Sequence, residues 1–185
     1  TGPILLLEND LELIESKKKT YEQLKKSINL LNKYKAIQIR LRSKFCPGEP
    51  FEGLRKYKKY WSNTNVSRIR RLFRPKKAHR LIGTSPYFLD SPEIFHDNII
   101  KKICEGHYLV PSSVMTWANL AILVDRDIYL NTIIKKAEQT KSRKYINGFK
   151  NIEIELNCSW WRKKEFNIIV TPGLFKHIRL SYRGY

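Results

Sequence analysis

Apolar side chains recur every three or four residues in the first quarter of the chain. From Thr20 to Phe45 there is neither Gly nor Pro, and the spacing places the apolar positions on one face of a long amphipathic helix. These positions are Tyr21, Leu24, Ile28, Leu31, Tyr34, Ile37, Leu41 and Phe45. The Pro- and Gly-containing segment 46–50 predicts the end of this helix. Two shorter helical segments are predicted over Leu54–Trp61 and Val66–Phe73.

The second half of the chain predicts helices first. Ser91 precedes Pro92, which is a favourable N-cap and first-turn pair, and predicts a helix that runs to Cys104. A second helix is expected from Ser112 to Lys136, because its apolar positions again follow a helical period.

After residue 141 the apolar period changes from about 3.6 to two. Alternation over Ile152–Cys158 and Phe166–Val170, with Phe175–Tyr182 as a third segment, predicts a C-terminal three-stranded antiparallel meander. The expected fold class is therefore α+β. A candidate linker at Arg74–Pro86 divides the chain into domains 1–80 and 81–185. No apolar run reaches the roughly 20 residues of a membrane span.

Charge narrows the class of partner. The chain has 185 residues, 36 Lys and Arg and 17 Asp and Glu, for a net charge of +19. Residues 17–80 carry 21 of the bases and three acids. Positive charge at this density favours a polyanionic partner, and nucleic acid is the expected one. A solvated helix face and an anionic membrane surface are the alternatives, but three acids supply too few i,i+4 partners for the former.

Motifs for catalysis are weak. The sequence contains no phosphate-binding glycine loop, no nucleophile elbow and no His-Glu-x-x-His pair, so we expect no enzyme, no cofactor and no small-molecule substrate. Glu153 and Glu155 would share one strand face, where a metal-dependent nuclease is the alternative to a solvated edge. Cys104 and His107, with His96 nearby, have ligand-like spacing but no fourth donor, so no metal site is predicted.

Nucleic-acid contacts are predicted from cations and aromatic rings. Trp160 and Trp161 precede three bases at an expected hairpin turn, where exposed rings could stack on unpaired bases. The alternative is that one Trp covers the core and the other contacts a partner protein. The predicted RNA-binding residues are Lys18, Lys19, Lys25, Lys26, Arg40, Arg42, Arg55, Lys56, Lys58, Lys59, Arg68, Arg70, Arg71, Arg74, Lys76, Lys77, Arg80, Trp160, Trp161, Arg162, Lys163 and Lys164.

Residues 18–73 resemble one ribosomal family. The segments that carry the likeness are Lys19-Thr20-Tyr21-Glu22-Gln23-Leu24, Ile37-Gln38-Ile39-Arg40-Leu41-Arg42 and Leu54-Arg55-Lys56-Tyr57-Lys58-Lys59. In this order, with a Pro/Gly break before the third, they resemble the ribosomal large-subunit protein family twenty-nine in its mitochondrial form. The resemblance implies a basic antiparallel helical hairpin on ribosomal RNA and no catalytic role. It also implies that the RNA-facing positions are Arg40, Arg42, Arg55, Lys58 and Lys59.

The expected function is thus that of a structural RNA-binding protein of a large ribosomal subunit, in a mitochondrion, with ribosomal RNA and neighbouring ribosomal proteins as partners. The first alternative is a DNA-binding module of a viral or chromatin-associated protein, which would read a duplex with Val66–Arg80. The second alternative is the metal-dependent nuclease that would use Glu153 and Glu155.

Overall fold

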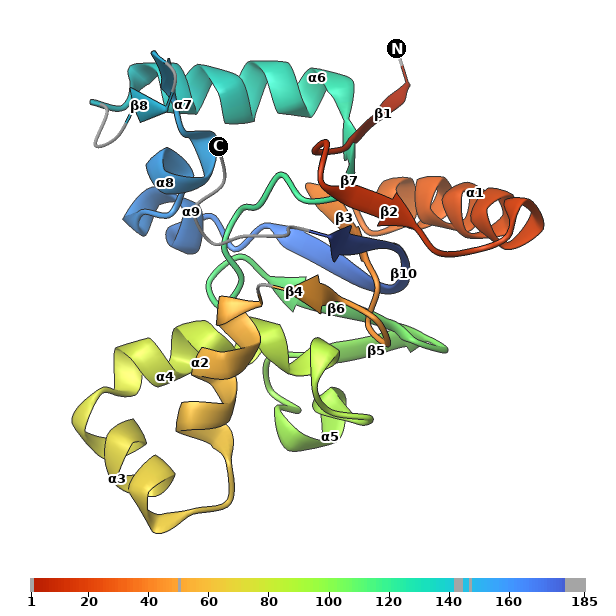
Figure 1. Cartoon of the computed structure of the whole chain (residues 1–185). Helices are drawn as coiled ribbons and strands as arrows, with labels where there is room; N and C mark the ends of the chain where they lie inside the picture. The colour runs from red at the N-terminus through yellow and green to blue at the C-terminus, as the bar shows by residue number, and fades with distance from the viewer. Residues whose placement is uncertain (1, 50, 142–144, 147, 179–185) are drawn as a thin grey trace.

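The computed structural model describes residues 2–49, 51–141, 145–146 and 148–178. Its central element is β10 (Asn167–Ile178), which lies within an eight-stranded mixed sheet of these residues. The sheet order is β1 (Pro3–Leu6), β7 (Ile122–Asp125), β3 (Gln38–Arg42), β10, β6 (His107–Pro111) and β5 (Lys101–Cys104) (Figure 1). Two short strands, β2 (Leu11–Leu13) and β4 (Gly48–Glu49), also pair with β10. A separate pair is formed by β8 (Tyr145–Ile146) and β9 (Phe149–Lys150).

The position of β10 follows from its apolar run. Ile168, Ile169 and Val170 are fully buried, because helices or loops cover both faces of the sheet at this point. β10 pairs in parallel with β3 and in an antiparallel manner with β6. Successive residues face opposite sides, so Ile168 and Val170 belong to one apolar cluster and Ile169 to another.

One face of the sheet is covered by α1 (Lys17–Lys33). The Ser16 hydroxyl accepts a hydrogen bond from the backbone N–H of Lys19 (3.4 Å) and caps the helix. Leu31 of α1 then packs with Ile39 and Leu41 of β3. This face buries the apolar stripe of the helix and leaves its lysines exposed.

The other face carries the remaining helices. They are α2 (Glu52–Trp61), α3 (Asn65–Phe73), α4 (Pro75–Leu81), the 3₁₀ helix Ile82–Tyr87, α5 (Pro92–Phe95), α6 (Arg126–Ile128) with the π-helical continuation Tyr129–Ile134, α7 (Lys135–Gln139), α8 (Ile152–Leu156) and α9 (Ser159–Lys163). Trp117 and Trp161 meet edge to face at the centre of this layer, with ring centroids 5.7 Å apart. The Trp161 indole N–H donates to the carbonyl oxygen of Met115 (2.7 Å), which satisfies the buried donor.

The predicted N-terminal helical hairpin is wrong. The expected helix over 20–45 ends at Lys33, and Gln38–Arg42 forms the buried strand β3. The helical period and the strand period both fit this segment: Ile37 and Leu41 have helical spacing, and Ile39 and Leu41 alternate with polar residues. Pairing of β3 with β7 and β10 satisfies its backbone and selects the strand. The two shorter helices predicted after the turn agree with α2 and α3.

The predicted arrangement of the second half is also wrong. The expected helix that starts at Ser91 lasts one turn, and the following residues form the β5–β6 hairpin around Gly106, which has a φ of +68°. β7 replaces the middle of the expected helix over 112–136.

The meander is absent from the described residues. Ile152–Leu156 is the helix α8 and the Trp pair lies on α9, so neither a first strand nor a hairpin turn forms there. The predicted strands over Phe166–Val170 and Phe175–Tyr182 are parts of the single strand β10 as far as Ile178, and residues 179–182 lie outside the described residues.

Strands from both sides of residue 80 hydrogen-bond within the same sheet. β3 precedes this position and β7, β6 and β10 follow it, so one sheet joins the two predicted domains. None of the described helices is both long and apolar enough to cross a lipid bilayer.

Candidate nucleic-acid interface

Helices α2, α3 and α4 pack against one another and project from the sheet as a unit (Figure 1). We call residues 52–81 the basic lobe. It contains eleven Lys and Arg residues and a single acid, Glu52. Its attachment lies on the side of the sheet opposite α1, because Ile82 and Trp61 belong to the apolar cluster of that side.

Polar side chains fix the turn between α2 and α3. The Thr64 hydroxyl accepts from the backbone N–H of Ser67 (3.2 Å) and caps α3. The buried Ser67 hydroxyl donates to the carbonyl oxygen of Lys59 (3.1 Å). The Trp61 indole N–H donates to the carbonyl oxygen of Ala78 (3.0 Å), which joins α2 to α4. These bonds hold the three short helices in one arrangement.

Two arginines of α3 are held against α2 by neutral partners. Arg71 donates to the carbonyl oxygen of Tyr60 (2.6 Å), and its guanidinium carbon lies 4.9 Å from the centre of the Trp61 ring. Arg70 donates to the carbonyl oxygen of Lys59 (3.3 Å). Carbonyl and ring contacts orient a guanidinium without cancelling its charge. These contacts therefore bring no negative countercharge to either arginine.

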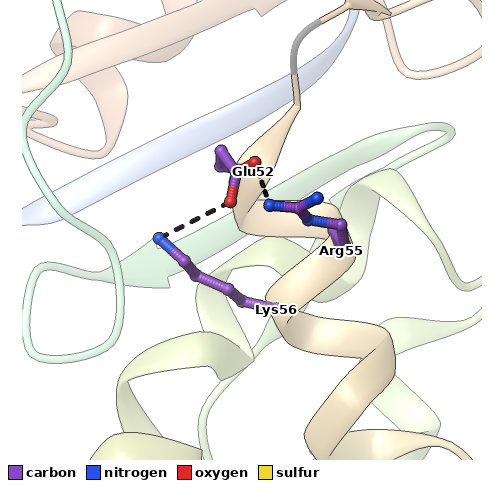
Figure 2. Close-up of polar contacts among 3 residues, drawn as sticks. All are labelled: Glu52, Arg55 and Lys56. Carbon is purple, nitrogen blue, oxygen red and sulfur yellow. Dashed lines mark hydrogen bonds and ion pairs between the residues drawn. The ribbon is translucent and has the colours of Figure 1, made fainter.

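Glu52 lies at the start of α2 and orients two cations. Its carboxylate oxygens lie 2.5 Å from an Arg55 guanidinium nitrogen and 3.9 Å from the Lys56 ammonium (Figure 2). Such exposed i,i+3 and i,i+4 pairs contribute little stability. One carboxylate cannot neutralise eleven bases, so the lobe has a formal charge of +10.

A groove of about 710 Å³ lies between the three helices, and we call it the basic groove. It is lined by Glu52, Arg55, Lys56, Lys59, Tyr60, Ile69, Arg70, Phe73, Arg74 and Lys77. The Phe73 ring is 83% exposed and the Ile69 side chain 52% exposed. The groove thus combines six cations with apolar surface that no described residue covers.

A second hollow of about 890 Å³ adjoins the basic groove and shares Glu52, Lys56 and Lys77 with it. We call it the inner cavity, since it extends from the lobe to the sheet. Its charged lining residues are Arg40, Arg42, Glu52, Lys56, Lys77, Arg80, Glu153 and Arg162, and its wall also includes Phe51, Tyr87, Met115 and Trp117.

Arg40 and Arg42 lie inside the protein and not on the exposed surface, with exposed fractions of 8% and 6%. Arg42 donates from Nε to the carbonyl oxygen of Pro47 (2.6 Å) and from Nη2 to that of Gly48 (2.8 Å). Arg40 donates from Nη2 to the carbonyl oxygen of Thr116. Burial lowers the pKa of Arg40, while Tyr87 and Glu153 act in the opposite direction. Alternation along β3 turns both arginines away from α1.

The structure separates the predicted RNA-binding residues into several groups. Most cations of the lobe are exposed. They are Arg55, Lys56, Lys58, Lys59, Arg68, Arg74, Lys76, Lys77 and Arg80, while Arg70 and Arg71 are half-buried. Lys18, Lys19, Lys25 and Lys26 are exposed on α1, which is on the opposite side of the sheet and is not brought together with the lobe.

The predicted Trp and basic cluster is divided between core and surface. Trp161 is fully buried and has no face available for stacking, whereas Trp160 is half-buried. Arg162 lines the inner cavity, and Lys163 and Lys164 are exposed on or just after α9. Phe73, Ile69 and Glu52 line the basic groove but are not among the predicted site residues. The helical period of α3 contains Ile69 and Phe73, but this period does not distinguish an exposed apolar stripe from a buried one.

The residues considered for metal chemistry do not converge. Glu153 accepts a hydrogen bond from the backbone N–H of Asn119 (2.8 Å), and Glu155, two positions along α8, is buried. Among the described residues, no group of three or more His, Cys, Asp or Glu side chains could hold a metal ion. Cys104 is a free thiol, and His96 contacts the Tyr57 hydroxyl.

No protein-family model, curated protein or solved structure matches the chain. The interpretation of the basic lobe therefore rests on its geometry and charge.

Proposed function

We propose that this chain binds RNA through the basic lobe, as a structural component of a ribonucleoprotein and not as an enzyme. The observation that carries the proposal is the basic groove, which places six cations and the exposed Phe73 ring around one concave surface. Cations at this density attract phosphates and release their counterions. An exposed ring beside them offers a stacking surface to an unpaired base.

The shape of the groove favours a single strand over a duplex. A strand can lie in a concave channel with phosphates against the cations and bases against apolar side chains. RNA is the nucleic acid that commonly presents unpaired, splayed bases. The contacts of Arg70 and Arg71 with α2 support the same interpretation, because these two side chains are held within the lobe and do not project from α3.

The narrower assignment to a mitochondrial large ribosomal subunit rests on the resemblance of residues 18–73 to the ribosomal family. Its supporting residues within the lobe are Arg55, Lys58 and Lys59, which are exposed on α2. Co-sedimentation of the native protein with large ribosomal subunits tests this assignment. Recovery of the protein only in ribosome-free fractions would contradict it and would leave the RNA-binding proposal in place.

Duplex DNA is the second candidate partner, and one feature of the lobe favours it. A three-residue turn, 62–64, joins α2 to α3, as in helix-turn-helix proteins that insert the second helix into the major groove. Arg68 is exposed on this second helix. Under this alternative, α3 would give sequence discrimination of about 1–3 kcal/mol per mismatched base pair.

Equilibrium binding to a fluorescent 12-nucleotide RNA tests the proposal, with a duplex DNA of the same length as comparison. The lobe variant Lys59→Gln/Arg74→Gln/Lys77→Gln should lose at least tenfold in RNA affinity at physiological salt. The matched control Lys18→Gln/Lys25→Gln/Lys26→Gln removes the same charge from α1 and should change affinity less than threefold. Equal losses in both variants would contradict a lobe-specific interface, and tighter, sequence-dependent duplex binding would favour the DNA alternative.

A further inference from the structure

The inner cavity has a composition unlike that of the exposed lobe. Six of its lining residues are Lys or Arg and two are acids, and its volume of about 890 Å³ lies within the range of small-molecule sites. Cations at its edge, such as Lys56 and Lys77, are shared with the basic groove. Others are contributed by the sheet and by α9, which bring charge into the interior.

Arg40 provides a buried, incompletely bonded donor in this cavity. Its Nη2 group donates to the carbonyl oxygen of Thr116, but its Nε–H is buried and has no hydrogen-bond acceptor. A buried N–H without an acceptor costs free energy, and more so on a charged group. Burial also lowers the pKa of Arg40, which expresses the same lack of solvation. An oxyanion in the cavity would supply both an acceptor and a countercharge.

Two further cations, Arg80 and Arg162, line the wall of the same cavity. Burial lowers the pKa of Arg162, and the positive charge of Arg80 lowers it further, whereas Cys158 raises it. Arg162 is oriented by donating to the Asn157 side-chain oxygen (3.0 Å). Like charges that line one cavity repel each other. A dianion between them would convert the repulsion into two attractive contacts.

The charge balance of the cavity leaves room for such an anion. Glu52 is already engaged with Arg55 and Lys56 at the start of α2 (Figure 2). Glu153 raises the pKa of Arg40 and accepts the backbone N–H of Asn119. The cavity lining has six cations and two carboxylates, so its net formal charge is +4. A ligand with a single carboxylate would neutralise only one of these four charges.

Part of the remaining wall of the cavity is apolar. Val114, Met115 and Trp117 contribute to it, and all three belong to the apolar cluster above the sheet. The Phe51 and Tyr87 rings meet edge to face nearby, with centroids 5.2 Å apart. An inorganic anion would leave this surface without a partner. A ligand with both a phosphate and a flat organic group matches the cationic and the apolar residues of the lining.

We propose that the inner cavity binds the phosphomonoester of a nucleotide, with Arg40, Arg80 and Arg162 around the phosphate and the organic part against the wall that contains Met115. The nucleotide is either free or the phosphorylated end of a strand, since the basic groove adjoins the same cavity and shares Lys56 and Lys77 with it. Binding of a free nucleotide is independent of the proposed RNA-binding function, and only the strand source rests on it.

Calorimetric titration of the full chain tests this site with adenosine monophosphate, adenosine and inorganic phosphate as probes. Adenosine monophosphate should bind at least tenfold more tightly than either other probe. Arg162→Gln should reduce that affinity at least tenfold, while Lys163→Gln, which removes the same charge from the adjacent exposed position, should leave it within twofold. Arg80→Gln provides a second cavity variant, and circular dichroism of each variant shows that the fold is retained.

Two RNA decamers, with and without a terminal phosphate, distinguish the sources. If the phosphorylated strand binds more tightly and Arg162→Gln abolishes this difference, the cavity binds a strand end. If both strands bind equally and adenosine monophosphate still binds, the cavity binds a free nucleotide. No binding of adenosine monophosphate, or equal binding of adenosine, would overturn the proposal. Failure of the RNA-binding proposal would appear separately: the lobe variant would then bind the unphosphorylated decamer with the same affinity as the unmodified protein.

Discussion

The Tyr57 hydroxyl oxygen lies 3.0 Å from Nε2 of His96, and both side chains are buried. Tyr57 is on α2 and His96 follows α5, so this contact holds the basic lobe to the rest of the protein. The Trp61 ring also meets the imidazole edge to face, with centroids 4.7 Å apart. Burial lowers the pKa of His96 to about 4, so at neutral pH the ring is uncharged and its Nε2 can accept the Tyr57 O–H.

Acidification should therefore destabilise the fold through His96. Its pKa is about 4 in the folded protein and about 6.5 in an unfolded chain, so the unfolded state binds the proton more tightly. The contribution of neutral His96 is complete above pH 6.5 and decreases as the pH falls towards 4, by up to about 3 kcal/mol. Urea denaturation between pH 7.5 and 4.5 measures this loss.

Matched variants assign that loss to one residue. His96→Gln should make the free energy of unfolding less dependent on pH, whereas His79→Gln, at an exposed position of α4, should leave the dependence unchanged. His107 is also buried and its pKa is also lowered, so a smaller slope of the same sign remains. An undiminished slope in His96→Gln would contradict the assignment.

Tyr57→Phe should destabilise the protein by about 1–2 kcal/mol at pH 7, because it leaves the buried Nε2 of His96 without a donor. The loss is measured by urea denaturation. The control is Tyr21→Phe, since Tyr21 is 67% exposed and its hydroxyl is solvated in both states. Equal stabilities of the two variants would show that the Tyr57–His96 contact contributes nothing.

Local sequence patterns were sufficient for α2 and α3 but not for β3. The two helices lie within one polar-rich segment, where Thr64 and a three-residue turn define the boundary. Leu41 fits a helical period with Ile37 and a strand period with Ile39, and partners far away in the sequence decide between the two for β3. β10 lies more than 120 residues further along the chain, and no local property of Gln38–Arg42 specifies that pairing.

The candidate site was predictable to the extent that it depends on charge. The predicted concentration of bases in residues 17–80 includes the lobe, and most of its long cationic side chains remain at the surface. The same rule failed for Arg40 and Arg42, whose guanidinium groups are satisfied in part by the carbonyl groups of Thr116, Pro47 and Gly48. Those acceptors are assembled by the tertiary fold, so composition alone could not place these arginines in the inner cavity.

Gly173 should be intolerant of substitution. Its φ is +88°, and a Cβ atom added there would lie 2.3 Å from the carbonyl oxygen of Arg42, where β10 shifts register beside β3. Gly173→Ala should cost at least about 3 kcal/mol, since backbone strain and a clash with main-chain atoms add. Gly148→Ala is the control, because its φ is +80° but, apart from its chain neighbours, no atom of the described residues lies within 4 Å of the added Cβ; it should cost about 1–2 kcal/mol. Thermal denaturation compares the two.

Affinity and salt dependence should separate the roles of Phe73 and Arg74 in the basic groove. Arg74→Gln should make the slope of log K against log salt shallower by about 0.7, the value for one phosphate contact of a single strand. Phe73→Ala should weaken RNA binding by about 1–3 kcal/mol through lost stacking and leave that slope unchanged. Phe45→Ala is the control, because Phe45 is equally exposed at 83% but lies outside the lobe.

Anisotropy titrations between 50 and 300 mM salt, roughly the range over which counterion release is resolved, measure both the affinity and the salt dependence. A changed slope in Phe73→Ala, or an equal loss in Phe45→Ala, would contradict a stacking role for the ring.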